Sequence, residues 1–365
     1  MTKQAERTKA ILRIAALGAV SAAILALLKV LGILNLRLFG EAFAPGNGAI
    51  WLIAASLIAM TAVALVRYGL ILRLVSFKAG PAQIIASGLI SQAIGQWTPG
   101  SMAITEIIRF GLMAGLGEGA KGRLGLSILI DRLLGLGTMF LIGGFAALYL
   151  QISGGLLIKH PALVLSLVIL SLVIGIGLIL SPLLAKTFFW RKFSRALAKT
   201  PDQAISSGLP APLPTKSLLV RIMRRLSRAV ELLNGADIRP RRLVLPLALS
   251  LLIPFLNAST LYFASRAIGH PLPPLVILAA VPFTILAIFL PLGLAGYGGP
   301  QLMAAATFGL FHVRTETVVA ACLVQNTVVL AVTTLLGGLS AGFALEQLRG
   351  ILAGRKNRLS GRRSP

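Results

Sequence analysis

The chain has 365 residues, of which 56% are hydrophobic and 12% are charged, and it carries a net charge of +25. A soluble domain has about 25% charged residues, so this composition leaves too little polar surface to cover a water-soluble globule. The charge would suit a nucleic-acid-binding protein, but the basic residues gather beside apolar segments, at 3–13, 67–78, 121–123, 186–242 and 349–363. This distribution orients membrane proteins and predicts, as partners, lipids with anionic headgroups at the cytoplasmic face, and no nucleic acid.

Six apolar segments are long enough to cross a hydrocarbon core, which takes about 20 residues. They cover residues 11–33, 49–73, 124–150, 161–185, 243–265 and 317–343. The first has the basic and then apolar order of a signal peptide, but its apolar part is too long and no Ala-x-Ala site closes it. We therefore expect an uncleaved first span and an all-α membrane protein with about six full transmembrane helices.

Two further apolar segments are interrupted, and each divides into two pieces of half the usual length. The first, 82–116, is broken by Thr98, Pro99 and Gly100. The second, 274–312, is broken by a stretch that contains Pro291, Gly293, Gly296, Gly298, Gly299 and Pro300. Such breaks free backbone groups that lipid cannot satisfy, so they are expected inside protein or beside a water-filled cavity.

The basic clusters define a topology, because cytoplasmic loops carry the excess of Lys and Arg. With these clusters inside, segment 82–116 enters and leaves on the cytoplasmic side, and segment 274–312 enters and leaves on the outer side. Each is expected to be a re-entrant helical hairpin, and the units 49–150 and 243–343 take opposite orientations. Paired broken segments in inverted units indicate a transport site near the bilayer midplane. No residue-level similarity relates the two units, so the symmetry rests on topology alone.

The chain from 1 to 365 is expected to form a single integral membrane domain with a basic cytoplasmic loop at 186–242 and a basic tail at 346–365. Within the loop, residues 216–233 place apolar side chains on one helical face and basic side chains on the other. Such a helix lies in the membrane interface and binds anionic lipid, or it is a solvated loop helix that packs on the protein. The tail is expected to be disordered and attracted to lipid.

Charged side chains inside a membrane are costly, so each one predicts a function. Glu106 and Arg109 are one helical turn apart and can pair on one face, just after a predicted helix start at Ser101. That helix start and Arg109 would cradle a phosphate headgroup; the alternative is a structural ion pair that holds the hairpin. Asp131 and Arg132, two turns into the next span, either neutralise Arg109 and Glu106 or pair with them structurally.

The glycine-rich stretch at 293–299 has no preceding strand and no P-loop lysine, so it is not a nucleotide-binding loop. We expect it to allow close backbone packing or to surround a cavity with carbonyl groups. Gln301, Gln325 and Asn326 either face that cavity or hydrogen-bond between helices, and the second role is the commoner one for such residues.

Catalysis is not expected from this sequence. The histidines lie near span ends without metal-ligand spacing: His160, His270 and His312. No nucleophile motif occurs. Two acids, Glu106 and Asp131, lie within apolar segments, but the arginines beside them would keep both ionised, which disfavours a proton-donating role. We expect no enzyme activity, no metal and no cofactor.

Several short motifs carry a resemblance to a known family. They are Gln96-Trp97-Thr98-Pro99-Gly100, Glu106-Ile107-Ile108-Arg109, Ser127-Ile128-Leu129-Ile130-Asp131-Arg132, Leu290-Pro291-Leu292-Gly293, Gly296-Tyr297-Gly298 and Gly337-Gly338. The pattern resembles the lysylphosphatidylglycerol synthase TM region family from residue 10 to residue 345. That family usually has a charged Arg-Glu pair after the outer glycines, whereas Pro300 and Gln301 stand here, which weakens any substrate contact inferred at the outer hairpin.

The resemblance implies a domain like a phospholipid flippase. In the best-known members this domain is fused to a cytosolic aminoacyl-transferase domain. With the chain ending at Pro365, we expect no such domain and no aminoacylation of lipid by this chain alone. Some stand-alone relatives are encoded beside genes for hopanoid or glycolipid synthesis.

We therefore expect a protein of the bacterial inner membrane, with both termini cytoplasmic, that translocates or presents a lipid between leaflets. The lipid would be an anionic phospholipid or an isoprenoid- or hopanoid-type lipid. The residues expected to bind it are Arg109, Glu106, Asp131, Arg132, Pro99, Gly100, Gly296, Gly298, Gly299 and Gln301. The alternative is a non-catalytic membrane partner subunit of a lipid-modifying or glycosyl-transferring enzyme.

Overall fold

The structure is a computed structural model, and it describes residues 22–24, 26–30, 32, 36–98, 101–114, 120–153, 161–184, 240–289 and 293–360. These residues are almost entirely helical, and the chain is an all-α membrane protein. The helices are α2 (Leu36–Ala42), α3 (Ala49–Leu74), α4 (Pro81–Gln96), α5 (Ser101–Ala114), α6 (Ala120–Ile152), α7 (Pro161–Leu184), α10 (Pro240–Ala267), α11 (Pro274–Phe289), α12 (Gly299–Gly309) and α13 (Thr315–Ser360). Two short strands, β1 (Gly293–Leu294) and β2 (Tyr297–Gly298), precede α12.

Among the described residues, five helices are long and apolar enough to cross a membrane, namely α3, α6, α7, α10 and α13. They coincide with five of the six predicted full spans. The predicted span at 11–33 lies mostly outside the described residues, and so does the predicted amphipathic helix at 216–233.

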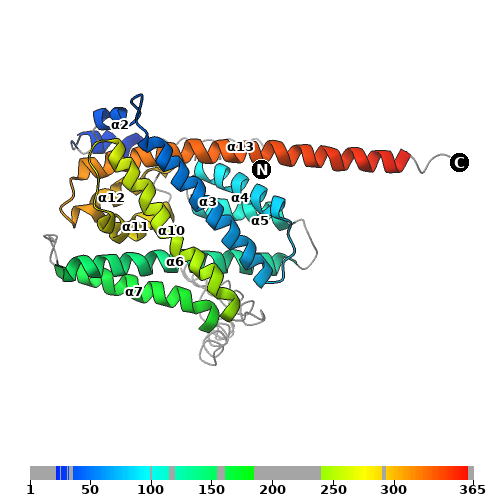
Figure 1. Cartoon of the computed structure of the whole chain (residues 1–365), viewed down its shortest axis with the longest axis horizontal. Helices are drawn as coiled ribbons and strands as arrows, with labels where there is room; N and C mark the ends of the chain where they lie inside the picture. The colour runs from blue at the N-terminus through cyan, green and yellow to red at the C-terminus, as the bar shows by residue number, and fades with distance from the viewer. Residues whose placement is uncertain are drawn as a thin grey trace, which may run out of the picture.

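The prediction of a disordered tail is wrong for its first part. α13 continues as one helix to Ser360, well past Phe343, where its apolar stretch ends. No proline interrupts this stretch, and its leucines, arginines and lysines favour helix. As a result α13 projects beyond all the other helices (Figure 1).

Two pairs of packed helices form opposite edges of the molecule (Figure 1). α6 and α7 lie side by side along one edge, and α4 packs on α13 along the other. α3 and α10 pack on each other and run diagonally between these edges. We call α3 to α6 the first half of the chain and α10 to α13 the second half. The contacts between the halves are reciprocal: α4 of the first half packs on α13 of the second, and α11 of the second packs on α6 of the first.

Each broken segment folds as two short helices that contact each other, α4 with α5 and α11 with α12. α4 has 16 residues, which span about 24 Å, less than the roughly 30 Å of a hydrocarbon core. The first break contains Pro99 and Gly100, which lie outside the described residues. Re-entry of each pair on one side of the bilayer, and the inverted orientation of the two units, stay predictions of the charge distribution.

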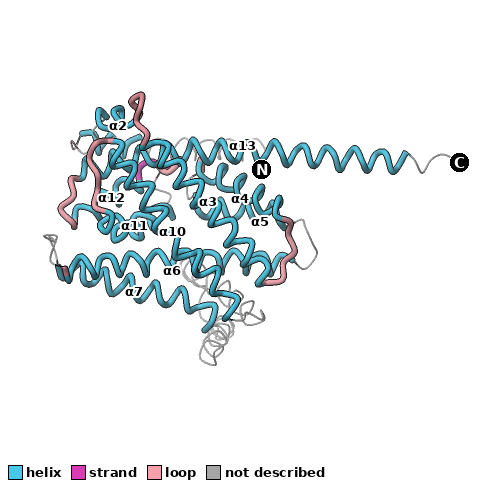
Figure 2. The backbone as a smooth tube through the Cα atoms, viewed as in Figure 1, coloured by secondary structure: helices cyan, strands magenta, loops and turns pink. Residues whose placement is uncertain are grey.

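The second break is a tight β-hairpin and not only a flexible Gly/Pro stretch (Figure 2). β1 pairs antiparallel with β2, with Leu294 opposite Tyr297. The two residues between the strands both have positive φ, 54° at Ala295 and 76° at Gly296. This is the backbone of a two-residue turn that matches the twist of its strands, and only Gly296 adopts it without strain. The hairpin satisfies backbone groups that lipid could not.

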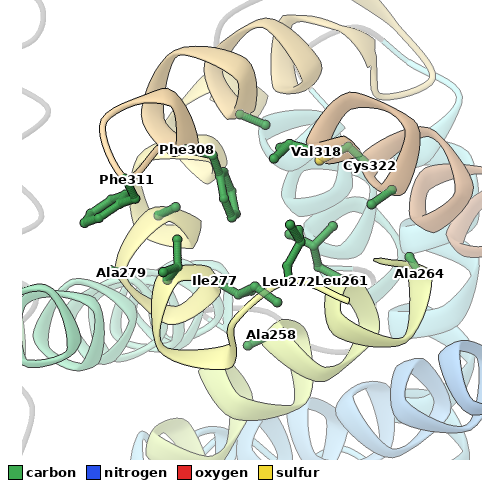
Figure 3. Packing of buried hydrophobic residues seen from close by; sticks show 14 of the residues in the cluster. Ala258, Leu261, Ala264, Leu272, Ile277, Ala279, Phe308, Phe311, Val318 and Cys322 are labelled. Carbon is green, nitrogen blue, oxygen red and sulfur yellow. The ribbon is translucent and has the colours of Figure 1, made fainter. Parts of the chain in front are cut away.

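The largest buried cluster holds α10, α11, α12 and α13 together and consists mainly of small side chains. Leu261, Ile277 and Phe308 reach into the space between these helices, with alanines filling in around them (Figure 3). Lipid tails are as apolar as the core, so association of membrane helices depends on close packing rather than on escape from water. Alanines at buried positions let these backbones approach.

Large apolar side chains point outward from the spanning helices. Trp51, Ile58 and Val66 of α3 are exposed, as are Ile169 and Val173 of α7. An exposed apolar surface of this extent would make a soluble monomer aggregate, whereas the hydrocarbon of a bilayer covers it. The exposure pattern is that of a multi-pass membrane protein.

Candidate functional site

A cavity of about 330 Å³ lies between the two halves of the chain. Its volume falls within the range of small-molecule sites, about 300–1,000 Å³. Its wall includes residues of α3, α4, α5 and α6 from the first half, and of α10, α11, α12 and α13 from the second. Because this cavity joins both broken segments, we treat it as the candidate site.

One part of the wall is charged. Arg67, Arg109, Asp131 and Arg132 all line the cavity, and Glu106 lies directly behind two of these arginines. Together these residues comprise three arginines and two carboxylates, a formal net charge of +1. Such a cluster inside a membrane is costly and indicates function.

Glu106 binds two arginines at once. Its Oε1 lies 3.5 Å from a terminal nitrogen of Arg109, one helical turn away on α5. The same oxygen accepts a hydrogen bond from Nη2 of Arg132 on α6. The predicted pairing of Glu106 with Arg109 is therefore present, and of the two predicted partners on α6 it is Arg132 that reaches Glu106.

Asp131 pairs with Arg67. The charge pattern places Arg67 in the cytoplasmic cluster at 67–78, but only 7% of its side chain is exposed and it contacts Asp131 at 2.9 Å. Its Nη1 also donates a hydrogen bond to Oγ of Ser250 on α10, at 3.2 Å. Proximity in sequence to Arg73 and Lys78 does not mean proximity to the membrane surface. Arg67 precedes Arg73 by six positions, about 1.7 helical turns, and this spacing is the signal in the sequence that Arg67 lies deeper.

Both cavity arginines of the Glu106 cluster keep a buried donor without a partner. Nε of Arg109 and Nε of Arg132 are buried and have no hydrogen-bond partner within the described part of the chain, and the same holds for the acceptor Oε2 of Glu106. The guanidinium of Arg109 lies 4.7 Å above the ring of Tyr68, which fixes its position. An unsatisfied buried polar group costs about 1–3 kcal/mol, so the two arginine donors favour a ligand with acceptor oxygens, whereas Oε2 of Glu106 favours a donor group.

Gln301 does not line the cavity; it holds the outer turn. It is completely buried, its Oε1 accepts a hydrogen bond from the Gly298 backbone at 2.7 Å, and its Nε2 donates to the Gly296 carbonyl at 3.4 Å. Asn326 of α13 donates to the same carbonyl at 2.7 Å and does line the cavity. Gln301 therefore takes neither predicted role, because it neither lines the cavity nor hydrogen-bonds between helices. Gln325 and Asn326 of α13 take both roles: they line the cavity, and Gln325 donates to Thr260 of α10 while Asn326 donates to the turn.

Residues that flank the first break lie close to the outer turn and to the cavity. A Cβ atom built on Gly296 would lie 3.5 Å from Nε2 of Gln96, the last residue of α4. Ser101, on the far side of the first break, and Pro300, just after the second, both line the cavity. Gly298 has a φ of 106°, which favours glycine, and Gly299 is buried at the start of α12. The glycines of the outer break therefore shape the turn and do not contact the interior of the cavity.

Within the described residues, no three metal-ligating side chains lie close together. The polar chemistry of the cavity consists of guanidinium groups, paired carboxylates, amides and hydroxyls. Guanidinium groups are suited to binding an anion, and amides and hydroxyls are suited to hydrogen bonds with polar atoms attached to it.

Comparison with known proteins identifies a family. The family model of the lysylphosphatidylglycerol synthase TM region matches residues 13–337, which include both broken segments and every residue that lines the cavity. No curated protein matches the chain.

Proposed function

Because the chain belongs to the lysylphosphatidylglycerol synthase TM region family, we propose that it translocates or presents an anionic or isoprenoid-type lipid between the leaflets of the bacterial inner membrane. It acts there without catalysis, with both termini in the cytoplasm. The observation that supports this most directly is the cavity between the two halves of the chain, whose arginines retain buried donors. A headgroup phosphate has the acceptor oxygens that these donors require.

The size of the cavity favours a headgroup as its occupant. A space of about 330 Å³ holds a phosphate and a small polar group, and it is too small for the two acyl chains of a phospholipid as well. The chains would stay in the bilayer while the headgroup passes the middle of the membrane. Broken helices beside a substrate site are typical of transporters.

Arg109 is the residue on which we expect headgroup binding to depend most. It lines the cavity, it has an unpartnered Nε within the described part of the chain, and its only ion pair there is the 3.5 Å contact with Glu106. Arg67, by contrast, is held at 2.9 Å by Asp131. Glu106, Asp131 and Arg132 adjust the charge that Arg109 presents.

Lipid movement in liposomes tests the proposal. Purified protein is reconstituted with phosphatidylglycerol or an isoprenoid phosphate that carries a fluorophore on its apolar part, and quencher added outside reports movement. We expect protein-dependent movement that Arg109→Ala reduces by tenfold or more, as for loss of about 1.4 kcal/mol or more of binding. Arg73→Ala is the matched control, because Arg73 is exposed at the end of α3 and should leave the rate unchanged.

A folded wild-type protein that moves neither lipid would overturn the translocator proposal. The partner-subunit alternative would then gain support. It predicts that Arg109→Ala leaves cellular function intact, whereas substitutions on the amphipathic segment 216–233 abolish it.

A further inference from the structure

The cavity has a second polar region, which contains amides and no charge. Its side chains are Gln92 and Gln96 from α4, Asn257 from α10, and Gln325 and Asn326 from α13. Gln92, Gln96 and Asn257 make no side-chain hydrogen bond to any residue that the structure describes. Gln325 donates one hydrogen bond to the hydroxyl of Thr260, and Asn326 donates one to the carbonyl of Gly296. An amide offers two donors and a carbonyl acceptor, so this region retains both kinds of group for a ligand.

Helix geometry separates the amide region from the charged region. On α10, Ser250 contacts Arg67, and Asn257 follows seven residues later, about 10 Å along the helix axis. On α5, Ser101 begins the helix beside Gly95, the residue before Gln96, and Arg109 follows eight residues later, about 12 Å along the axis. Both helices therefore place the charged groups at one end of the cavity and the amides at the other.

The net charge of the charged region limits which phosphate groups it can bind. Three arginines and two carboxylates leave one positive charge, and an uncompensated charge in a low-dielectric site is costly. A phosphodiester supplies one negative charge and restores neutrality. A phosphate monoester carries between about 1.5 and 2 negative charges at pH 7 and would leave an excess of negative charge. A net-neutral zwitterion would leave the positive charge uncompensated.

The amide region limits which headgroup can be attached to the phosphate. Within the described wall of the cavity, the only carboxylate is Asp131, which is already bound to Arg67. An ammonium group placed about 10 Å from it would meet only amides and hydroxyls. Hydroxyl groups, which both donate and accept, match amides directly.

We propose that the cavity selects a lipid with a phosphodiester and an uncharged, hydroxylated headgroup, such as a glycerol or a sugar. This inference rests on the proposed function, because it names the substrate class of the same site. The phosphate binds at Arg109 and Arg132, and the headgroup hydroxyls bind Asn257 and Gln96.

Three acyl-labelled lipids with unmodified headgroups test the inference in the same liposome assay. Phosphatidylglycerol has the proposed chemistry, phosphatidylethanolamine replaces the hydroxyls by an ammonium group, and phosphatidic acid is a monoester. We expect phosphatidylglycerol to move about tenfold faster than the other two, the effect of one or two hydrogen bonds and a matched charge. Asn257→Leu should reduce the phosphatidylglycerol rate to that of phosphatidylethanolamine, without changing the rate of phosphatidylethanolamine itself.

Two further variants make the result decisive. Gln96→Leu removes an amide from a different helix and should have the same selective effect, which guards against misfolding of a single variant. Gln151→Leu is the matched control, because Gln151 lies at the end of α6 outside the cavity and bonds to the Pro161 carbonyl; it should change no rate.

The outcomes separate the inference from the proposed function. Equal movement of all three lipids, or an equal loss of all three rates in Asn257→Leu and Gln96→Leu, would overturn the headgroup inference while the translocator proposal stands. Movement of no lipid by the folded wild-type protein would overturn both.

Discussion

At the scale of single residues, the ion pair between Arg67 and Asp131 is the most deeply buried charge interaction among the described residues. The two side chains are 7% and 6% exposed and join α3 to α6, with Ser250 of α10 as a third partner. A buried pair repays the cost of desolvation only when its geometry is good. Its value here lies in placing three helices around the charged end of the cavity.

The pair predicts a non-additive effect on stability. Arg67→Met or Asp131→Leu alone leaves one buried charge without its partner and should lower the free energy of unfolding by about 3–5 kcal/mol. The double variant removes both charges and should recover most of that loss. A double-mutant cycle from unfolding in mixed micelles measures the coupling. Additive losses would show that the two side chains do not stabilise each other.

At the scale of the elements, glycines set the distance between α6 and α7. A Cβ atom on Gly175 of α7 would lie 2.7 Å from the backbone nitrogen of Leu141 and 3.0 Å from the carbonyl oxygen of Gly137. Backbone atoms cannot rotate out of the way as a side chain can. The two helices therefore touch backbone to backbone, the close approach that small residues permit in membranes.

This contact predicts different results for two glycines of the same helix. Gly175→Ala should force α6 and α7 apart and lower the free energy of unfolding by about 1–3 kcal/mol. Gly177→Ala, whose Cβ would meet nothing within 4 Å, should leave stability unchanged or raise it slightly through helix propensity. Thermal unfolding of the purified variants in one detergent compares them. Equal behaviour of the two would mean that α7 does not pack through Gly175.

The outer turn also needs a glycine, here because of its backbone angles. Gly296 at a φ of 76° lets the chain reverse in two residues, and Gln301 and Asn326 satisfy its carbonyl group. The turn therefore depends on side chains of α12 and α13, which follow it in the chain. Composition predicted a break at this place, but the hairpin that fills it depends on these partners.

At the scale of the whole molecule, the two halves contact each other reciprocally and share one cavity. α4 packs on α13, and α11 packs on α6. The first helix of each short pair therefore packs on a long helix of the other half. Neither half encloses the cavity alone. Alternating movement of one half against the other would expose the site to each leaflet in turn.

The proposed topology predicts that equivalent positions of the halves lie on opposite sides of the membrane. Ser76 follows α3 and His270 follows α10, and both residues are exposed. In a Cys322→Ala background, which removes the only native cysteine, Ser76→Cys should react with an impermeant maleimide only after the inner membrane is opened. His270→Cys should react in intact spheroplasts. Labelling of both from the same side would overturn the inverted arrangement.

The sequence alone determined the class of the protein, the positions of five spans, the two breaks and the pairing of Glu106 with Arg109. These features follow from local rules: an apolar run must be long enough to cross lipid, and residues three apart on a helix share a face. The resemblance in short motifs was sufficient to predict the family.

Only the tertiary structure decided which distant residues meet. It paired Arg67 with Asp131, brought Gln96 beside Gly296, assigned Gln301 to the turn instead of the cavity, and placed amides at one end and arginines at the other. The contacts of Arg67 with Asp131 and of Gln96 with Gly296 join elements that are far apart in the chain, whereas Gln301 bonds to the turn directly before it. The free energy that selects them comes from packing and from satisfying buried polar groups, which no periodicity along one helix records.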